Sequence, residues 1–159
     1  LGGELLKQLT KGDALHVPYK GESAALTDLL GGVTTFQFST PSVCVPRFES
    51  GQLKGLAVAA PKRSRMAPNI PTTAEAGVPG LEAGTWYYIA APKGTPAAIL
   101  DKLSAVIVDV QNDEKYRKRL LDLGYELDPL TNSQAVKAEL KAEVEKWRPV
   151  VKAAGLTPG

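Results

Sequence analysis

The sequence predicts an α/β protein. Segments with the apolar pattern of β-strands alternate along the chain with segments whose apolar residues recur every three or four positions, as they do in helices. The chain has 159 residues, which is enough for one domain or two small lobes. Strands that are separated by helices usually pair in parallel. We therefore expect an α/β fold with largely parallel pairing.

The first part of the chain predicts two helices and two strands. Residues 4–10 have the composition of the end of a helix, which Gly12 terminates. Residues 14–19 alternate as a strand does, and residues 23–31 form the next helix, which ends at two glycines. A β-rich run follows at residues 34–39.

The amino-acid composition changes in the middle of the chain. We expect a short helix at residues 41–51 and a buried strand at residues 53–60. Residues 61–84 are rich in proline and glycine and are interpreted as a connection between lobes. Within this connection, Thr72 and Glu75 have the spacing of a capping box for a single helical turn.

The last part predicts a strand at residues 85–92 and then three helical segments. Thr95 is expected to cap a helix that has Pro96 at its first position and reaches about Gln111. The apolar face of this helix is formed by Ile99, Leu103, Val106 and Val110.

A second helix is expected from Asn112 to Gly124, followed by a short strand at residues 125–130. The last helix begins near Ser133, and Pro149 should kink it.

The composition excludes several classes of protein. There are 19 Lys and Arg against 17 Asp and Glu, a net charge of +2, which is too small a bias for a nucleic-acid or membrane-surface partner. Cys44 is the only cysteine, so there is no internal disulfide and no cysteine–histidine cluster for a metal. We expect no metal and no cofactor. No apolar stretch approaches the ~20 residues that span a bilayer, and the missing initiator methionine suggests a mature or truncated product.

The turn at residues 18–23 is the first candidate site. A helix amino end presents unpaired N–H groups and about half a positive charge. Gly21 allows close approach of a ligand, Ser23 adds a hydroxyl and Lys20 adds a formal charge. These features suit a carboxylate or phosphate. The alternative is an ordinary turn with Ser23 as the helix cap and Lys20 in solvent.

A second strand-to-helix turn contains the hydroxyls of Ser39, Thr40 and Ser42. Ligands of open α/β sheets gather at the carboxyl ends of strands, so two such turns on neighbouring strands would converge on one cleft. Taken alone, this motif is more often a helix cap.

Other conspicuous residues have simpler explanations. The aromatic run at residues 85–88 is more often core than pocket wall, His16 has no acidic neighbour, and Cys44 is expected to be buried and inert. The basic runs at residues 62–65 and 113–119 are expected to be solvated surface. Nucleotide-binding, zinc-protease and nucleophile-elbow motifs are absent from the sequence, and we predict no catalytic residues.

Several phrases together are more specific than any one of them. In order they are HVPYKG, DLLGG, LKGLAV, IPTTAEAGVPG, GTP and WRPVVKAAG. This order resembles the Bug family, the extracytoplasmic solute receptors of tripartite tricarboxylate transporters. The resemblance extends over essentially the whole chain, but family receptors are about twice as long, and the chain corresponds to their carboxyl-terminal half.

The resemblance implies a two-lobed, type II periplasmic binding protein fold from which the amino-terminal part of the first lobe is missing. Residues 1–83 would be the middle (second) lobe, in part, and residues 84–159 the carboxyl-terminal part of the first lobe. The implied function is capture of a small carboxylate, without turnover, for the membrane permease subunits of the transporter. The implied location is the periplasm, with a signal peptide upstream of this chain.

The resemblance also selects binding residues. Pro18, Tyr19, Lys20 and Gly21 match one family loop, and Ser39 and Thr40 match a second. Together with Ser23 these are the predicted ligand-binding residues. Many family members have an acidic or amide residue where Ser39 stands and Leu-Pro where Pro41 and Ser42 stand, so the identity of the carboxylate stays open.

Two alternative functions stay open. One is the effector-binding domain of a transcription regulator, and the other is a small-molecule enzyme. For the chain as it stands we expect weak solute binding and self-association or marginal stability, because half of the cleft and several strand partners would be missing.

Overall fold

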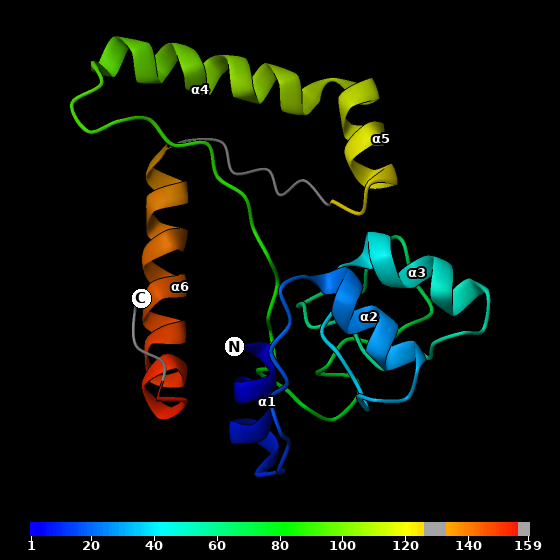
Figure 1. The fold of residues 1–159 in the computed structure, drawn as a ribbon. Coiled ribbons are helices and arrows are strands. Elements are labelled where there is room, and N and C mark those ends of the chain that lie inside the picture. The colour runs from blue at the N-terminus through cyan, green and yellow to red at the C-terminus, as the bar shows by residue number, and fades with distance from the viewer. Residues whose placement is uncertain (126–132, 156–159) are drawn as a thin grey trace. The chain divides into compact units, whose positions relative to one another are not determined.

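The computed structural model describes residues 1–125 and 133–155. It divides into two compact units, Leu1–Gly84 and Thr85–Gly159, which are described separately (Figure 1). Whether these units correspond to the two predicted lobes stays a prediction.

The first unit contains three helices, α1 (Gly2–Thr10), α2 (Glu22–Leu30) and α3 (Pro41–Glu49). Each forms where the sequence predicts a helix. A Cβ on Gly2 would lie 3.2 Å from the Phe38 ring, so the start of α1 lies against the segment that precedes α3. Leu26 of α2 and Val45 of α3 are among the few buried apolar residues of the described chain.

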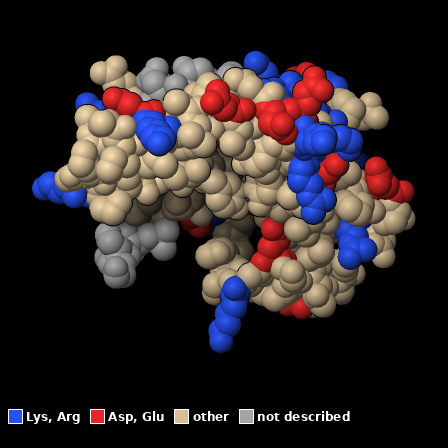
Figure 2. Space-filling view, turned by 90° about the horizontal axis from the view of Figure 1, so that it is seen from above, with Lys and Arg blue, Asp and Glu red and all other residues tan. Residues whose placement is uncertain are grey.

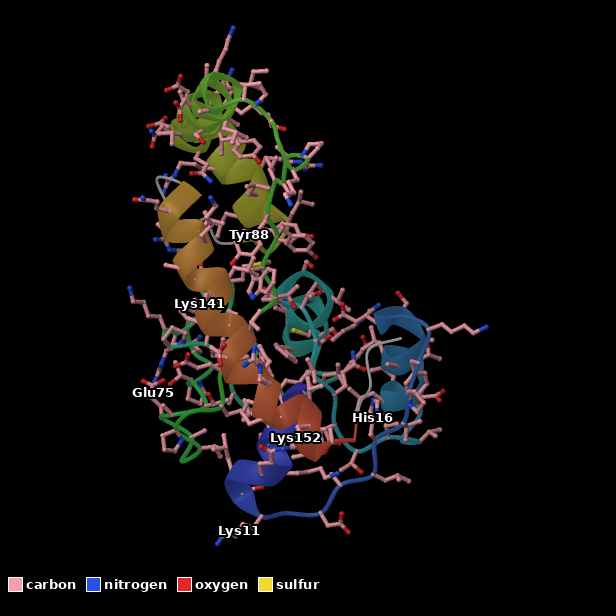
Figure 3. The ribbon with its side chains drawn as sticks, turned by 90° about the vertical axis from the view of Figure 1, so that its left-hand side faces the viewer. Lys11, His16, Glu75, Tyr88, Lys141 and Lys152 are labelled. Carbon is pink, nitrogen blue, oxygen red and sulfur yellow. The ribbon has the colours of Figure 1, made fainter. Side chains whose placement is uncertain are left out.

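The segment at residues 61–84, predicted to connect two lobes, belongs to the first unit and contains several local hydrogen bonds. Thr72 N–H donates to Glu75 Oε2 at 2.7 Å and Glu75 N–H donates to Thr72 Oγ1 at 3.2 Å, which confirms the predicted capping box. Arg63 Nε donates to both carboxylate oxygens of Glu75, at 3.2 and 2.9 Å. Arg63 is therefore part of the structure of this loop and not simply a solvated charge (Glu75 is labelled in Figure 3).

The second unit contains α4 (Ala97–Asn112), α5 (Glu114–Asp122) and α6 (Ser133–Ala153). Asp113 ends α4 and caps α5, because its extended backbone interrupts the helix and its side chain accepts from Tyr116 N–H at 2.8 Å. α6 continues through Pro149.

The predicted cap of α4 is wrong. Pro96 occupies the N-cap position and the helix starts at Ala97. The Thr95 hydroxyl donates instead to the Pro92 carbonyl at 2.8 Å, so it stabilises the preceding turn.

The strands are not confirmed. No strand is assigned among the described residues, and within them an isolated parallel bridge joins Val58 to Thr72. A strand requires a hydrogen-bonded neighbour along its length. The segments predicted as strands at residues 14–19, 34–39 and 85–92 have no such neighbour in the described chain and form no regular secondary structure. The strand predicted at residues 125–130 lies almost wholly outside the described residues.

The apolar face predicted for α4 has the expected helical spacing but is not covered. Ile99, Leu103, Val106 and Val110 are 51%, 46%, 51% and 42% exposed. Within the part of the chain that the structure describes, no helix has both the length and the apolar character needed to cross a bilayer. Acidic and basic side chains lie next to one another on the face drawn in Figure 2, in keeping with the small net charge.

Candidate functional site

The turn before α2 is fixed by one side-chain hydrogen bond. The Tyr19 hydroxyl donates to Asp28 Oδ2 at 2.6 Å, which ties the residue before Lys20 to the body of α2. This hydrogen bond raises the pKa of Tyr19 above its usual value. The hydroxyl therefore remains protonated and keeps its role as a donor.

The amino end of α2 is not capped by a side chain. Gly21 is the N-cap residue, and Ser23 is exposed and makes no cap hydrogen bond. Ser23 is therefore not the cap that the ordinary-turn alternative requires, although Lys20 is exposed as that alternative expects. The Lys20 side chain is exposed beside this helix end. An uncapped helix end keeps N–H donors and a positive potential, both of which favour an anion.

Gly21 is not required by backbone strain. Its φ of 175° and ψ of 164° are extended values that any residue adopts. A Cβ at this position would meet no atom within 4 Å. In this structure a glycine at position 21 matters only if a ligand approaches the backbone there.

The second predicted loop is joined to the first by Glu22, the first residue of α2. Glu22 Oε1 accepts from the Ser39 hydroxyl at 2.5 Å and from Thr40 N–H at 2.6 Å. Glu22 Oε2 accepts from the Thr40 hydroxyl at 3.0 Å. All three residues are half-buried. The carboxylate thus accepts from the hydroxyls of Ser39 and Thr40 and from one backbone amide of the loop that starts α3.

Glu22 takes the place of the acid of a capping box at α3, because it accepts from the N–H of the N-cap residue Thr40. Thr40 is the N-cap residue of α3, but its side chain makes no cap hydrogen bond, and Val43 stands where a capping box would have an acid. The Thr72–Glu75 box solves the same problem with an acid three residues along. At α3 the acid comes instead from another helix.

Gln37 extends this group of polar residues. Its Nε2 donates to Ser39 Oγ at 3.2 Å. Its Oε1 is buried and has no hydrogen-bond partner in the described part of the chain. The Ser39 hydroxyl therefore accepts from Gln37 while it donates to Glu22.

The seven predicted binding residues fall into two groups that are in contact through Glu22. Ser39 and Thr40 bind the carboxylate of Glu22 directly. Of the other five, residues 18–21 lead into Glu22 and Ser23 follows it in α2. Sequence reasoning missed both Glu22 and Asp28. Glu22 could have been found from its position, because it is an acid in the first turn of a predicted helix that lies between the first candidate turn and the hydroxyl-rich second turn.

The other reactive residues form no site. Among the described residues no group of three or more histidine, cysteine or acidic side chains lies close enough to hold a metal ion. Cys44 is half-buried; burial raises the pKa of its thiol, and the charge of Glu22 raises it further. His16 is exposed on the segment between α1 and α2, so it is not a core residue (Figure 3).

The aromatic run at residues 85–88 is tied to α6 within the second unit. The Trp86 and Trp147 indole N–H groups donate to the same oxygen, Glu143 Oε2, at 3.2 and 2.8 Å. Burial raises the pKa of Glu143, but the hydrogen bonds from the two tryptophans, together with the charge and hydrogen bond of Lys146, leave it below its usual value. Trp86 also stacks on Tyr88 with ring centroids 4.5 Å apart. These contacts indicate a structural role, but Trp86 and Tyr87 are 43% and 71% exposed, so the run is not the buried core that the sequence predicts.

Comparison with known proteins gives a consistent family. The model of the tripartite tricarboxylate transporter family receptor matches residues 1–156. Protein BugT of Bordetella pertussis is 32% identical over 151 residues, which are 94% of this chain and 46% of that protein.

Solved structures are similar as well. A protein of R. palustris solved with adipate is 32% identical and has a TM-score of 0.79, over 99% of this chain and 52% of that one. MatC of Rhodopseudomonas palustris with bound malate is 32% identical with a TM-score of 0.77, over 94% and 52%. The chain spans about half the length of each of these three relatives.

Proposed function

Because the chain belongs to the tripartite tricarboxylate transporter receptor family, we propose that it is the carboxyl-terminal half of a receptor for a small carboxylate. The receptor captures the solute in the periplasm and delivers it to membrane permease subunits. It binds the solute and releases it chemically unchanged. Two relatives solved with adipate and malate support a dicarboxylate as the class of ligand to test first.

The observation that carries the proposal is the open amino end of α2 at residues 18–23. No side chain caps it, Lys20 lies exposed beside it, and Tyr19 holds the turn through Asp28. A ligand carboxylate there would accept from backbone N–H groups that otherwise face water. Pro18, Gly21 and Ser23 belong to the same turn and are proposed to contact the ligand. Ser39 and Thr40 lie at the adjacent loop, joined through Glu22.

In the whole protein we propose a two-lobed binding fold in which the ligand is enclosed between lobes. Closure removes water from the ligand and pairs its polar groups on both sides, which raises affinity. The segments that stay unpaired in this structure would gain strand neighbours in that fold.

The test is calorimetric titration of adipate, malate and citrate into a protein that contains this chain and the preceding half found in its relatives. The proposal predicts saturable binding of at least one acid, and recovery of that acid unchanged after prolonged incubation. Conversion of the acid would favour an enzyme. If the protein binds neither these acids nor any other small carboxylate, the proposal of a carboxylate receptor is contradicted.

A further inference from the structure

Glu22 holds a set of donors that is well suited to a carboxylate. Its two oxygens accept from the Ser39 hydroxyl, the Thr40 N–H and the Thr40 hydroxyl. A backbone amide and hydroxyls converging on one carboxylate form short, charge-assisted hydrogen bonds. A ligand carboxylate that reached this loop would need the same donors.

Glu22 also brings a negative charge to the place where the two loops meet. Among the described residues Glu22 forms no ion pair, whereas five ion pairs join other residues. Its charge is therefore stabilised by these hydrogen bonds and by the amino ends of α2 and α3, where it lies. Its own backbone begins α2, so the charge lies next to the turn at residues 18–23.

We propose that Glu22 is a specificity-determining residue, whose carboxylate occupies the donors of Ser39 and Thr40 and excludes a second ligand carboxylate from them. This inference rests on the proposed function. The ligand carboxylate is held at the turn of residues 18–23. The ligand group that faces Glu22 is uncharged or a hydrogen-bond donor, such as a hydroxyl or ammonium group.

Two substitutions separate charge from shape. Glu22→Gln keeps the size and one acceptor oxygen but removes the charge. Glu22→Ala leaves the donors of Ser39 and Thr40 without their acceptor. Glu49→Gln is the matched control, because Glu49 is an exposed acid at the far end of α3.

The first measurement is selectivity in the longer protein, with adipate and its monocarboxylate counterpart hexanoate as probes. Glu22→Gln is expected to raise the affinity for adipate relative to hexanoate by about tenfold, because it removes one like-charge repulsion in a half-buried site. Glu49→Gln is expected to leave the ratio unchanged. An unchanged ratio in Glu22→Gln overturns the proposal.

The second measurement does not depend on the receptor function. The Thr40 amide resonance in NMR spectra reports whether a carboxylate accepts its proton. In Glu22→Ala the resonance is expected to move upfield, and acetate should return it in a saturable manner. The parent protein should show no such response.

The two measurements distinguish the possible failures. If neither adipate nor hexanoate binds in any variant, the acetate titration tests the inference by itself. A Thr40 amide resonance that acetate restores in Glu22→Ala still shows that Glu22 occupies a carboxylate site. A Thr40 resonance that ignores acetate in Glu22→Ala, or that responds equally in the parent protein, overturns the inference.

Discussion

The Tyr19 hydroxyl lies 2.6 Å from Asp28 Oδ2 and donates a hydrogen bond to it. This contact spans nine residues and orders the turn that precedes α2. The position of Lys20 and Gly21 relative to the helix end thus depends on one phenol–carboxylate pair.

Tyr19→Phe should weaken ligand binding without unfolding the chain. The substitution removes the donor and keeps the ring, so the turn loses its tie to α2. We expect a lower carboxylate affinity and a slightly lower melting temperature. Tyr116→Phe, on the exposed surface of α5, is the control and should change neither. Equal affinities for the Tyr19 and Tyr116 variants would show that the turn does not need this hydrogen bond.

Lys20→Ala and Gly21→Ala should differ in how much binding they remove. An exposed charge contributes about 1 kcal/mol or less, so Lys20→Ala should weaken carboxylate binding by about fivefold at most. Gly21→Ala should fold normally, because its φ is extended and its Cβ meets no atom within 4 Å, yet it should weaken binding more by obstructing the ligand. Calorimetric titration compares the two.

Gly32→Ala is the control for backbone strain. Its φ is 74°, a value that costs other residues about 1–2 kcal/mol, so it should lower stability and leave binding unchanged. If Lys20→Ala weakens binding as much as Gly21→Ala or more, the lysine holds the anion and the helix end does not.

Glu75 should make the stability of the first unit depend on acid pH. The hydrogen bonds from Arg63 and from Thr72 N–H lower the pKa of Glu75 from 4.5 to about 2. A carboxyl group whose pKa is lowered by folding stabilises the fold above its unfolded pKa and loses that contribution as the pH falls. Stability should therefore decline between about pH 4.5 and pH 2, and less steeply in Glu75→Gln.

Thermal denaturation across this pH range measures the effect, with the exposed Glu82→Gln as control. Both side chains of the Arg63–Glu75 pair are 46% exposed, so the difference should shrink at high salt. A Glu75→Gln variant with the same pH profile as the parent would show that the pair does not stabilise the loop.

The chain on its own should self-associate. The face of α4 exposes Ile99, Leu103, Val106 and Val110 at helical spacing, and exposed apolar stripes of this kind promote association. Light scattering should detect species larger than a monomer, and Val106→Lys should reduce them. Asp101→Lys, an exposed polar position on the same helix, is the control. A monomeric parent chain would contradict this prediction.

The parts of the fold that could be predicted are those that neighbouring residues determine. Helix spacing placed α2 and α3 within one or two residues, and the Thr72–Glu75 box follows from a four-residue pattern. The predicted strands are not found in the structure, because a strand needs a hydrogen-bonded partner, and the sequence of the strand itself does not specify that partner. The predicted cap of α4 was wrong because the Thr95 hydroxyl donates to the nearby Pro92 carbonyl instead.

The candidate site was predictable only in part for the same reason. Turn composition pointed to Lys20, Gly21, Ser39 and Thr40, since glycines and hydroxyls before helices are local signals. Glu22 binds a loop that lies 17 and 18 residues away. No spacing rule predicts such a contact, so the residue that joins the two loops emerged only from the structure.

The most direct test of the carboxylate-receptor account is calorimetric titration of adipate and malate into two proteins in parallel. One is the 159-residue chain, and the other carries this chain together with the preceding half found in its relatives. The account predicts saturable binding of unchanged acid by the longer protein and weak or undetectable binding by the chain alone. Binding of equal strength by the monomeric chain, or no binding by the longer protein, would contradict it.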